Sequence, residues 1–390
     1  MSILTSRPVL RWAVPALAAV AVVGAGVAAK TIAGAAGPAL PPRTAAQLLV
    51  DLQTAQLDGL SGTVVEKADL GLPPAITTLA GALGGSQGSS ALTSLVAGKH
   101  TLRVWYSGPD KARVSLLGTG SESDIIKNSN ELWLWDSKSN TAEHHVFTPG
   151  ETSSPDKHLP GTLPSGLPSS IPTNPQDAAN LALKAIDPTT DVRTGNTAQV
   201  AGRDAYELIL TPKDKDSLVS EVRLAIDAKQ HLPLRVQVFA KGVTDPAIEV
   251  GFTQVSFNRP DDAQFTFSPP AGAKVSDLKD LMGGGAHATA PKIPDINPAD
   301  KAKQTVIGTG WTSVLVLRTP QQSPTADAGD PKTAQALNGL LQSLPKAGNG
   351  TALKTNLFSV LLTSDGRILV GSVSPEKLAQ IATQPAAQLK

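Results

Sequence analysis

The residue patterns that could support catalysis are few, and each has a simpler interpretation. Residues 84–88 match the G-x-S-x-G pattern of a nucleophilic serine. That chemistry needs the serine on a tight turn between a strand and a helix, whereas Ser86 lies in a low-complexity Gly/Ser stretch. Residues 213–216 alternate lysine and aspartate, which is typical of a solvated turn. No enzyme class is indicated, and we expect a non-catalytic protein.

Metal-binding patterns are equally sparse. His144 and His145 are adjacent on a predicted strand, where neighbouring side chains point to opposite faces and cannot share one ion. The chain has no cysteine, which excludes disulfides, thiolate zinc sites and cysteine nucleophiles. We therefore expect no metal and no cofactor.

The charge balance excludes another class of partner. The 390 residues include 34 Lys+Arg and 33 Asp+Glu, a net charge of +1. Nucleic-acid binding requires clustered positive charge, and no short basic run supplies it. Hydrophobic residues make up 41% of the chain, which is enough for a packed core, while 31 prolines and 34 glycines indicate long loops or linkers.

The N-terminus has the pattern of a membrane-targeting segment. Arg7 and Arg11 precede an uncharged stretch of 18 residues, 12–29, which as a helix would span roughly 27 Å. That length lies between a signal-peptide core and a membrane-spanning helix, which needs about 20 residues. Residues 33–35, Ala-Gly-Ala, fit a signal cleavage site. Residues 1–36 are thus predicted to be either a cleaved signal peptide or a retained anchor, and both place the remaining chain on the extracytoplasmic side.

The rest of the chain predicts a large β domain followed by a smaller one. Turn signals recur every 8–12 residues, the pattern of an antiparallel sheet. Thr44 is expected to cap a helix over 45–57. The predicted strand regions are 61–70, 101–108, 111–118, 123–137, 140–147, 197–213, 221–242, 247–258 and 264–275. Between them we expect a flap over 71–99, an exposed loop over 148–175 and a helix over 176–186.

A linker over 276–303 separates the predicted second domain, 304–390. That domain is expected to be a small α+β unit with four elements. These are a strand over 304–318, a helix over 334–345, a hairpin over 358–373 and a helix over 375–383.

The alternation of apolar side chains suggests what the large sheet covers. In 234–238, leucine and valines alternate with Arg235 and Gln237, which is the pattern of a strand packed on one face. In 131–135, however, both faces are apolar. Two interpretations remain open, an ordinary core and a hydrophobic cavity that takes an acyl chain. The candidate lining residues, taken from both faces because the sequence does not say which is inward, are Val104, Trp105, Leu116, Trp133, Trp135, Leu208, Leu210, Val236, Val238, Val250 and Phe252.

The order of motifs resembles a known superfamily. SGTVVE is followed by LRVWYSGPDKARVSLLG and NELWLWDSKSNTAEHH. VAGRDAYELILTPKD, VRLAIDAKQHLPLRVQVFAKG and EVGFTQVSFNRPDDAQFTFSPPAGAKV come later. Over residues 43–275 this is similar to the LolA/LolB lipoprotein-localisation superfamily. It is most similar to the exported LolA-like proteins of actinobacteria and to the N-terminal domain of the sigma-E regulator RseB (MucB). Residues 304–390 are not covered.

The resemblance implies an unclosed, half-open antiparallel β-barrel with helices as a lid, whose concave face holds lipoprotein acyl chains or related lipids. The first expected function is therefore an exported, membrane-tethered lipid- or lipoprotein-binding protein. An alternative is an RseB-like envelope-stress regulator that binds an anti-sigma factor or another membrane protein. A third is a structural domain with a solid core. Expected locations are the extracytoplasmic face of the cell membrane or, if the signal is cleaved, the exterior.

Overall fold

The computed structural model describes residues 39–72, 98–147, 188–277, 304–318, 339 and 341–387. The predicted N-terminal segment 1–36 and helix 176–186 lie outside these residues, as do the proline-rich loop 148–175 and most of the flap and the linker. Within the described residues, no helix is long and apolar enough to cross a membrane.

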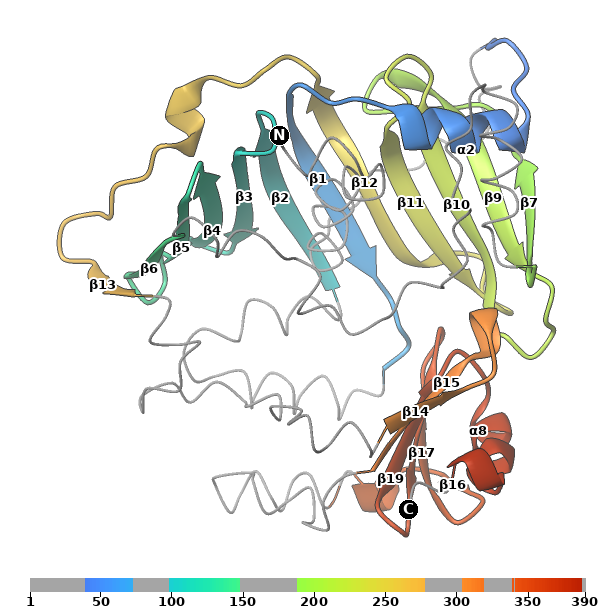
Figure 1. Cartoon of the computed structure of the whole chain (residues 1–390). Coiled ribbons are helices and arrows are strands. Elements are labelled where there is room, and N and C mark those ends of the chain that lie inside the picture. Colours follow the sequence, from blue (N-terminus) through green and yellow to red (C-terminus); the bar gives the residue numbers. More distant parts are fainter. Residues whose placement is uncertain are drawn as a thin grey trace.

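A large, curved antiparallel sheet dominates the fold (Figure 1). Its strands are β1 (Leu60–Ala68), β2 (Gly98–Tyr106), β3 (Lys111–Gly118), β4 (Ser121–Asn128), β5 (Glu131–Asp136), β6 (Thr141–Val146), β7 (Thr190–Thr194), β8 (Ala198–Val200), β9 (Arg203–Pro212), β10 (Val219–Asp227), β11 (Pro233–Ala240), β12 (Pro246–Ser256) and β13 (Lys274–Asp277). They are ordered β13-β6-β5-β4-β3-β2-β1-β12-β11-β10-β9-β7, and β8 pairs with β9. Only the β13–β6 pair is parallel among these strands. Because the described strands β13 and β7 end the sheet without pairing to each other, the expected half-open, mainly β architecture is confirmed.

Helix α2 (Ala45–Thr54) covers one end of this sheet. The Thr44 hydroxyl accepts a hydrogen bond from the Gln47 backbone N–H at 3.2 Å, and the Gln47 side chain accepts one from the Thr44 backbone N–H at 2.9 Å. This capping box fixes the predicted start of the helix. The helix ends at Thr54, three residues earlier than predicted. Its fully buried Leu48 packs against Tyr206, Leu208 and Ile226.

A second, six-stranded sheet forms the C-terminal unit. Its strands are β14 (Gln304–Ile307), β15 (Val314–Arg318), β16 (Lys346–Ala347), β17 (Gly350–Lys354), β18 (Ser359–Thr363) and β19 (Arg367–Gly371), ordered β14-β15-β19-β18-β17-β16. Helix α8 (Pro375–Ala382), capped by Ser374, packs Leu378 and Ile381 against the buried face of this sheet. The predicted hairpin and final helix are thus present.

Several elements differ from the sequence-based expectation. The single strand expected over 304–318 is a pair of antiparallel strands, because Gly308 and Gly310 adopt positive φ angles of 81° and 63° and reverse the chain between them. Strands β7, β16 and β17 were not predicted, since they are short and carry few apolar residues. The helix expected over 334–345 is seen at 339 and 341–343 among the described residues, and β16 begins at Lys346.

The two sheets meet through an apolar cluster and a set of polar contacts. Leu70 and Leu357 contribute to the cluster from the two sides, and Trp311 packs against it. The Trp311 indole Nε1–H donates to the Thr190 hydroxyl at 2.7 Å. The Lys377 ammonium lies 2.6 Å from the Asp216 carboxylate. These contacts hold the C-terminal unit against one end of the large sheet (Figure 1).

We expect Trp311→Phe to destabilise the protein by about 1 kcal/mol, because it removes the indole donor and leaves the buried Thr190 hydroxyl unsatisfied. Urea unfolding of Trp311→Phe, Thr190→Val and the double variant measures the coupling. The double variant should cost less than the sum of the two single changes. Strict additivity would show that the hydrogen bond contributes nothing to the junction.

Candidate ligand-binding face

Strand register sorts the predicted lining residues by face, because directly opposed residues in an antiparallel pair share a face. Val250 lies opposite Val236, and Val236 lies opposite Leu224, which in turn lies opposite Leu208. On the other side, Val64 lies opposite both Phe252 and Leu102. The same face therefore carries eight of the predicted residues: Val104, Leu116, Leu208, Leu210, Val236, Val238, Val250 and Phe252.

The three predicted tryptophans lie on the opposite face. Trp105 is opposite Arg113, whose guanidinium lies 5.4 Å from the Trp105 ring centre. Trp133 stacks on His144 with ring centres 3.9 Å apart, and both Trp133 and Trp135 contact Phe267. The segment after β12 thus covers two of these rings. The predicted lining residues therefore divide into eight on the apolar face and three tryptophans on the opposite face.

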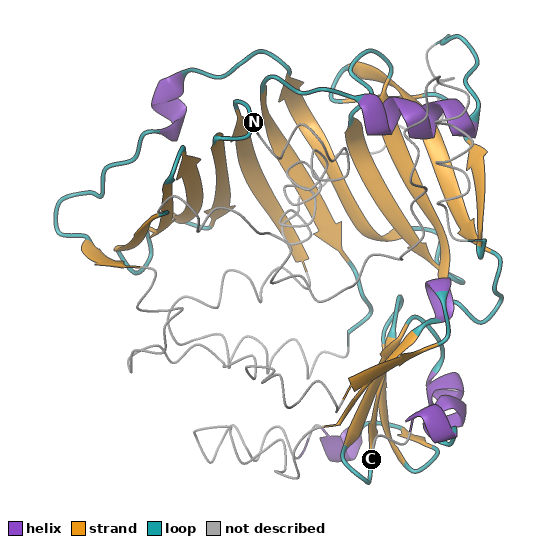
Figure 2. Cartoon of the chain, viewed as in Figure 1, coloured by secondary structure: helices purple, strands orange, loops and turns teal. Residues whose placement is uncertain are grey.

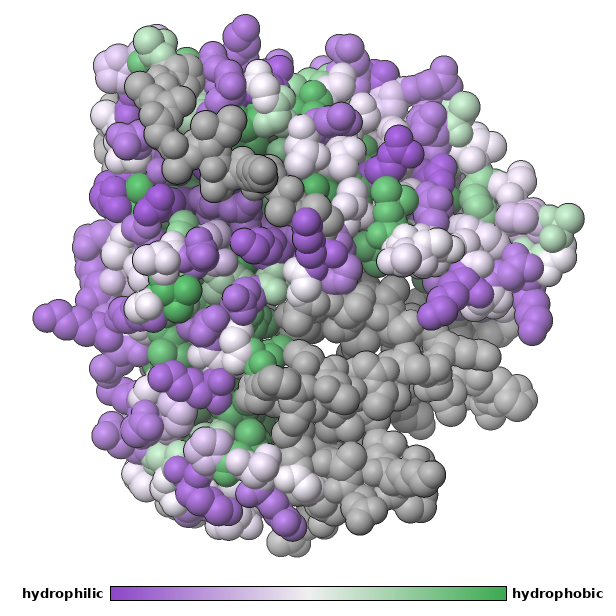
Figure 3. All heavy atoms as spheres, turned by 180° about the vertical axis from the view of Figure 1, so that it is seen from behind, coloured by the Kyte–Doolittle hydropathy of each residue, from purple (hydrophilic) through white to green (hydrophobic). Residues whose placement is uncertain are grey.

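The outer face also carries pairs of charged and polar side chains. The Arg235 guanidinium lies 3.9 Å from the Glu207 carboxylate on β9, and the Arg193 guanidinium lies 3.2 Å from Glu221 on β10. The Gln237 amide donates to Glu249 on the adjacent strand. Viewed from behind, the molecule shows many hydrophilic side chains over the large sheet (Figure 3). The sheet is therefore amphipathic, with its apolar face on the side that carries α2.

Different sections of the apolar face have different neighbours. Helix α2 lies across the end that contains β9 and β10 (Figure 2), so Leu208 and Leu210 belong to the core beneath it. Val238 packs into the cluster at the junction with the C-terminal unit. The section beyond β11, which we call the central apolar face, consists of Leu60, Val64, Leu102, Val104, Val114, Leu116, Val250 and Phe252.

The central apolar face extends across four neighbouring strands, β12, β1, β2 and β3, and continues onto β4. Ile125 on β4 lies opposite Val114 and is 46% exposed. Gly62 allows the Phe252 ring to approach β1, because a Cβ atom at Gly62 would lie 2.9 Å from that ring. A continuous apolar surface of this kind, partly exposed along its edge, suits an elongated apolar ligand.

Two titratable side chains lie within these apolar surroundings and were missed by the sequence reasoning. Glu66 on β1 is directly opposite His100 on β2 and Val250 on β12. Glu66 is 1% exposed, and burial raises the pKa of its carboxyl to about 8. Burial lowers the pKa of His100. Both groups are therefore biased toward their neutral forms. The sequence signal was present, since Glu66 occupies an apolar-phase position two residues after Val64 and two before Ala68.

Two further groups on this face show the same bias. Glu143 lies opposite Leu134, and burial raises its pKa. Lys127 lies opposite Ala112, and burial lowers its pKa although Asp110 acts in the opposite direction. Burial shifts the pKa of all four groups so that the neutral form is favoured, which is consistent with low polarity around these positions from β1 to β6.

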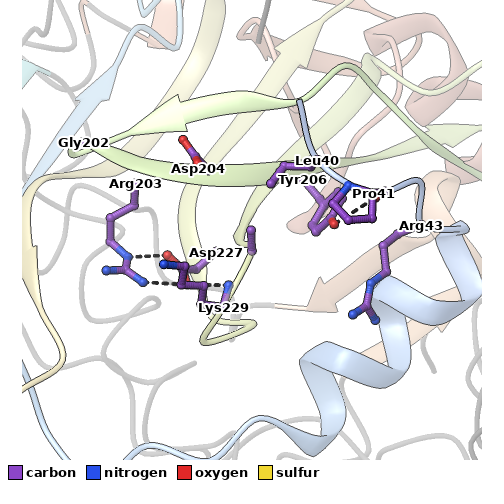
Figure 4. A pocket seen from close by; sticks show the side chains of 10 residues that line it. Leu40, Pro41, Arg43, Gly202, Arg203, Asp204, Tyr206, Asp227 and Lys229 are labelled. Atoms are coloured by element: carbon purple, nitrogen blue, oxygen red, sulfur yellow. Dashed lines mark hydrogen bonds and ion pairs between the residues drawn. The ribbon is translucent and has the colours of Figure 1, made fainter. Parts of the chain in front are cut away.

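A separate pocket of about 340 Å³ lies at the N-terminal end of α2 (Figure 4). The Arg203 guanidinium donates two hydrogen bonds to the carboxylate of Asp227, which is 1% exposed. The Tyr206 hydroxyl donates to the Pro41 carbonyl at 2.9 Å and ties the chain before α2 to β9. Burial alone would raise the pKa of Asp227, but the hydrogen bonds from Arg203 and from two backbone N–H groups lower it. The pocket is built around a structural ion pair.

We expect Asp227→Ala to destabilise the protein by roughly 2–3 kcal/mol, because it unpairs Arg203 and leaves the backbone N–H groups of Lys229 and Gln230 without their acceptor. Thermal or urea unfolding measures the loss. The exposed neighbour Asp204→Ala is the control and should stay within about 0.5 kcal/mol of wild type. Equal effects of the two substitutions would contradict the role given to Asp227.

The adjacent histidines of β6 do not form a metal site. His144 stacks on Trp133, whereas His145 packs edge-on against Phe147 and lies 3.6 Å from Asp277. The two rings thus lie on opposite faces, as expected. Among the described residues, no group of three or more His, Asp or Glu side chains could hold a metal ion. The G-x-S-x-G stretch at 84–88 lies outside those residues.

Several solved structures are similar to this chain. Similar solved structures include the MucA/MucB complex of Pseudomonas aeruginosa, at 14% identity and a TM-score of 0.39, covering 86% of this chain and 96% of that one. An uncharacterised conserved protein of Thermus thermophilus has 12% identity, coverages of 59% and 97%, and a TM-score of 0.32. A LolA superfamily protein of Nitrosomonas europaea has 12% identity, coverages of 58% and 99%, and a TM-score of 0.19.

No curated protein matches the chain with significance. The family model of the MucB/RseB N-terminal domain matches residues 99–266, which span β2 to the turn that follows β12. Three of the four strands that form the central apolar face, β2, β3 and β12, lie within the matched residues. The similarity to actinobacterial proteins stays a prediction. Residues 99–266 therefore match the MucB/RseB N-terminal domain, and the family resemblance expected from the sequence is confirmed.

Proposed function

We propose that the chain is an extracytoplasmic, non-catalytic protein that binds the acyl chain of a lipid or lipoprotein on the central apolar face. The observation that carries this proposal is the continuous apolar surface from β12 to β4, in which polar side chains are biased toward their neutral forms. The MucB/RseB N-terminal domain over residues 99–266 supports a role in the cell envelope. Residues 1–36 would provide export or a membrane tether.

The energetics of such binding require no reactive group. Each buried methylene contributes about 0.8 kcal/mol, so a chain of some 16 carbons could contribute up to roughly 10 kcal/mol before ordering costs. The central apolar face supplies valine, leucine and phenylalanine side chains for this contact. Specificity would then come from the few polar groups on the same face.

The test is native mass spectrometry, with lipid extraction, of the full chain purified from a membrane-rich bacterial host. We expect a lipid or acylated species to co-purify at near-stoichiometric amounts. A protein mass without ligand, unchanged after incubation with an acylated peptide, would overturn the proposal.

A regulatory function is the second candidate, in which the chain binds an anti-sigma factor or another membrane protein. MucB of Pseudomonas aeruginosa has been solved in complex with MucA. In this chain, β14 is an edge strand of the C-terminal sheet, and its Val306 lies opposite Leu315 with exposures of 61% and 37%. An exposed apolar edge can accept a strand or a side chain of a partner. Recovery of a single-pass membrane protein, lost on Val306→Lys, would favour this function.

A further inference from the structure

Glu66 and His100 carry two buried polar atoms without hydrogen-bond partners at one place on the apolar face. The Oε2 atom of Glu66 and the Nδ1 atom of His100 are both inaccessible to solvent and unpartnered in the described structure. The two residues occupy directly opposite positions near the end of β1 and the start of β2, and these adjacent strands lie near the middle of the large sheet (Figure 1). Their strand neighbours Val64 and Leu102 are apolar and buried.

Two buried polar atoms without hydrogen-bond partners reduce the stability of the folded protein unless a ligand supplies the missing partners. An unpaired polar group in an apolar surrounding costs about 1–3 kcal/mol, and the great majority of buried polar atoms in native proteins have partners. Neither residue takes part in the ion pairs of the outer face, because register places both on the side of Val64 and Val250. Two such atoms at opposed positions within a proposed binding surface point to a polar group of the ligand.

We propose that Glu66 and His100 form a polar anchor that binds the carbonyl-bearing linkage of an acyl ligand, with the Glu66 carboxyl donating a hydrogen bond to the carbonyl oxygen. This inference rests on the proposed function. In its neutral form the Glu66 carboxyl is a donor, and neutral His100 with its proton on Nε2 offers Nδ1 as an acceptor. An ester linkage satisfies Glu66 alone. An amide linkage, which also carries an N–H, satisfies both residues.

The chemistry of the linkage thus becomes a specificity determinant. An alkyl chain attached through an ether has the same apolar length but lacks the carbonyl acceptor. A ligand that leaves a buried polar group unpaired binds more weakly than one that satisfies it. The full chain should therefore prefer an ester-linked lipid over the matched ether-linked lipid by about 3- to 10-fold, the range of one net hydrogen bond.

The experiment is competitive native mass spectrometry of the full chain in detergent micelles. The probes are dipalmitoyl phosphatidylglycerol, its dihexadecyl ether analogue and an N-palmitoylated peptide. Wild type should prefer the ester to the ether, and Glu66→Leu should abolish that preference by weakening ester binding while ether binding is kept. Glu66→Gln, which keeps a donor, should retain the preference. His100→Leu should weaken only the amide-linked peptide. Near-UV circular dichroism confirms that each variant is folded.

The outcomes separate the anchor from the proposed function. Equal binding of ester and ether by wild type would overturn the anchor but leave acyl binding intact. An ester preference that persists in Glu66→Leu would have the same consequence. Failure of wild type to bind any probe would overturn both. Preference for the peptide over the ester, lost in His100→Leu, supports the anchor with a lipoprotein as the source of the acyl group. The reverse order would remove His100 from the anchor and leave Glu66 alone, with a membrane lipid as the source of the acyl group.

Discussion

Leu116→Asp should reduce binding of an acylated ligand by about 100-fold or more while Leu117→Asp leaves it nearly unchanged. The two leucines are adjacent on β3 and both half-buried, yet they point to opposite faces. Leu116 lies opposite Leu102 within the central apolar face, whereas Leu117 lies opposite Thr101 and Glu122. A carboxylate at position 116 would have to be desolvated when an acyl chain covers it, and that cost opposes binding.

The measurement is titration of both variants with the same acylated peptide, together with their unfolding curves. Because Leu116 packs against the buried residues Val64, Leu102 and Val104, Leu116→Asp should cost more stability than Leu117→Asp, so binding is compared under conditions in which the unfolding curves show both variants folded. Similar losses of binding in the two variants would show that the ligand does not discriminate between the faces. The deeper positions Leu208 and Leu210 are poorer tests, since they pack beneath α2 and their substitution with Asp would disrupt that core.

Glu66→Gln should stabilise the protein relative to wild type by an amount that grows with pH. The folded-state pKa of Glu66 is about 8, above its ordinary value of 4.5. Between these pH values the folded state holds the proton that the unfolded state releases, so wild-type stability falls as pH rises, by up to about 1.4 kcal/mol per pH unit. Its contribution is complete below pH 4.5 and lost as pH passes about 8. The glutamine variant has no such proton.

Urea unfolding of wild type and Glu66→Gln at intervals from pH 4.5 to 9 measures this difference. It should rise across the window and level off above pH 8. Glu131→Gln, at an exposed position on β5, is the control and should lack the rise. A difference that is flat or that decreases with pH would show that Glu66 ionises as an ordinary exposed carboxyl, and would remove the donor on which the carbonyl anchor depends.

Local sequence patterns determined much of the fold. Turn residues between alternating strands predicted the hairpins of the large sheet, and β3 occupies the residues expected for it, 111–118. Thr44 and Ser374 fixed the starts of α2 and α8 through side-chain caps. These features depend on residues close in sequence, where backbone preferences and hydrogen bonds within a few positions decide the outcome. The motif order gave the family resemblance, confirmed over residues 99–266.

Other features depend on pairing between distant strands and were decided only by the tertiary structure. Alternation places Trp133 and Leu134 on opposite faces, but it does not say which face is apolar across the whole sheet. Register with β4 and β6 supplied that answer. Glu66 and His100 are 34 positions apart in sequence and meet only because β1 pairs with β2 in one register. The burial that shifts their pKa values comes from the assembled face, so no local pattern could reveal it.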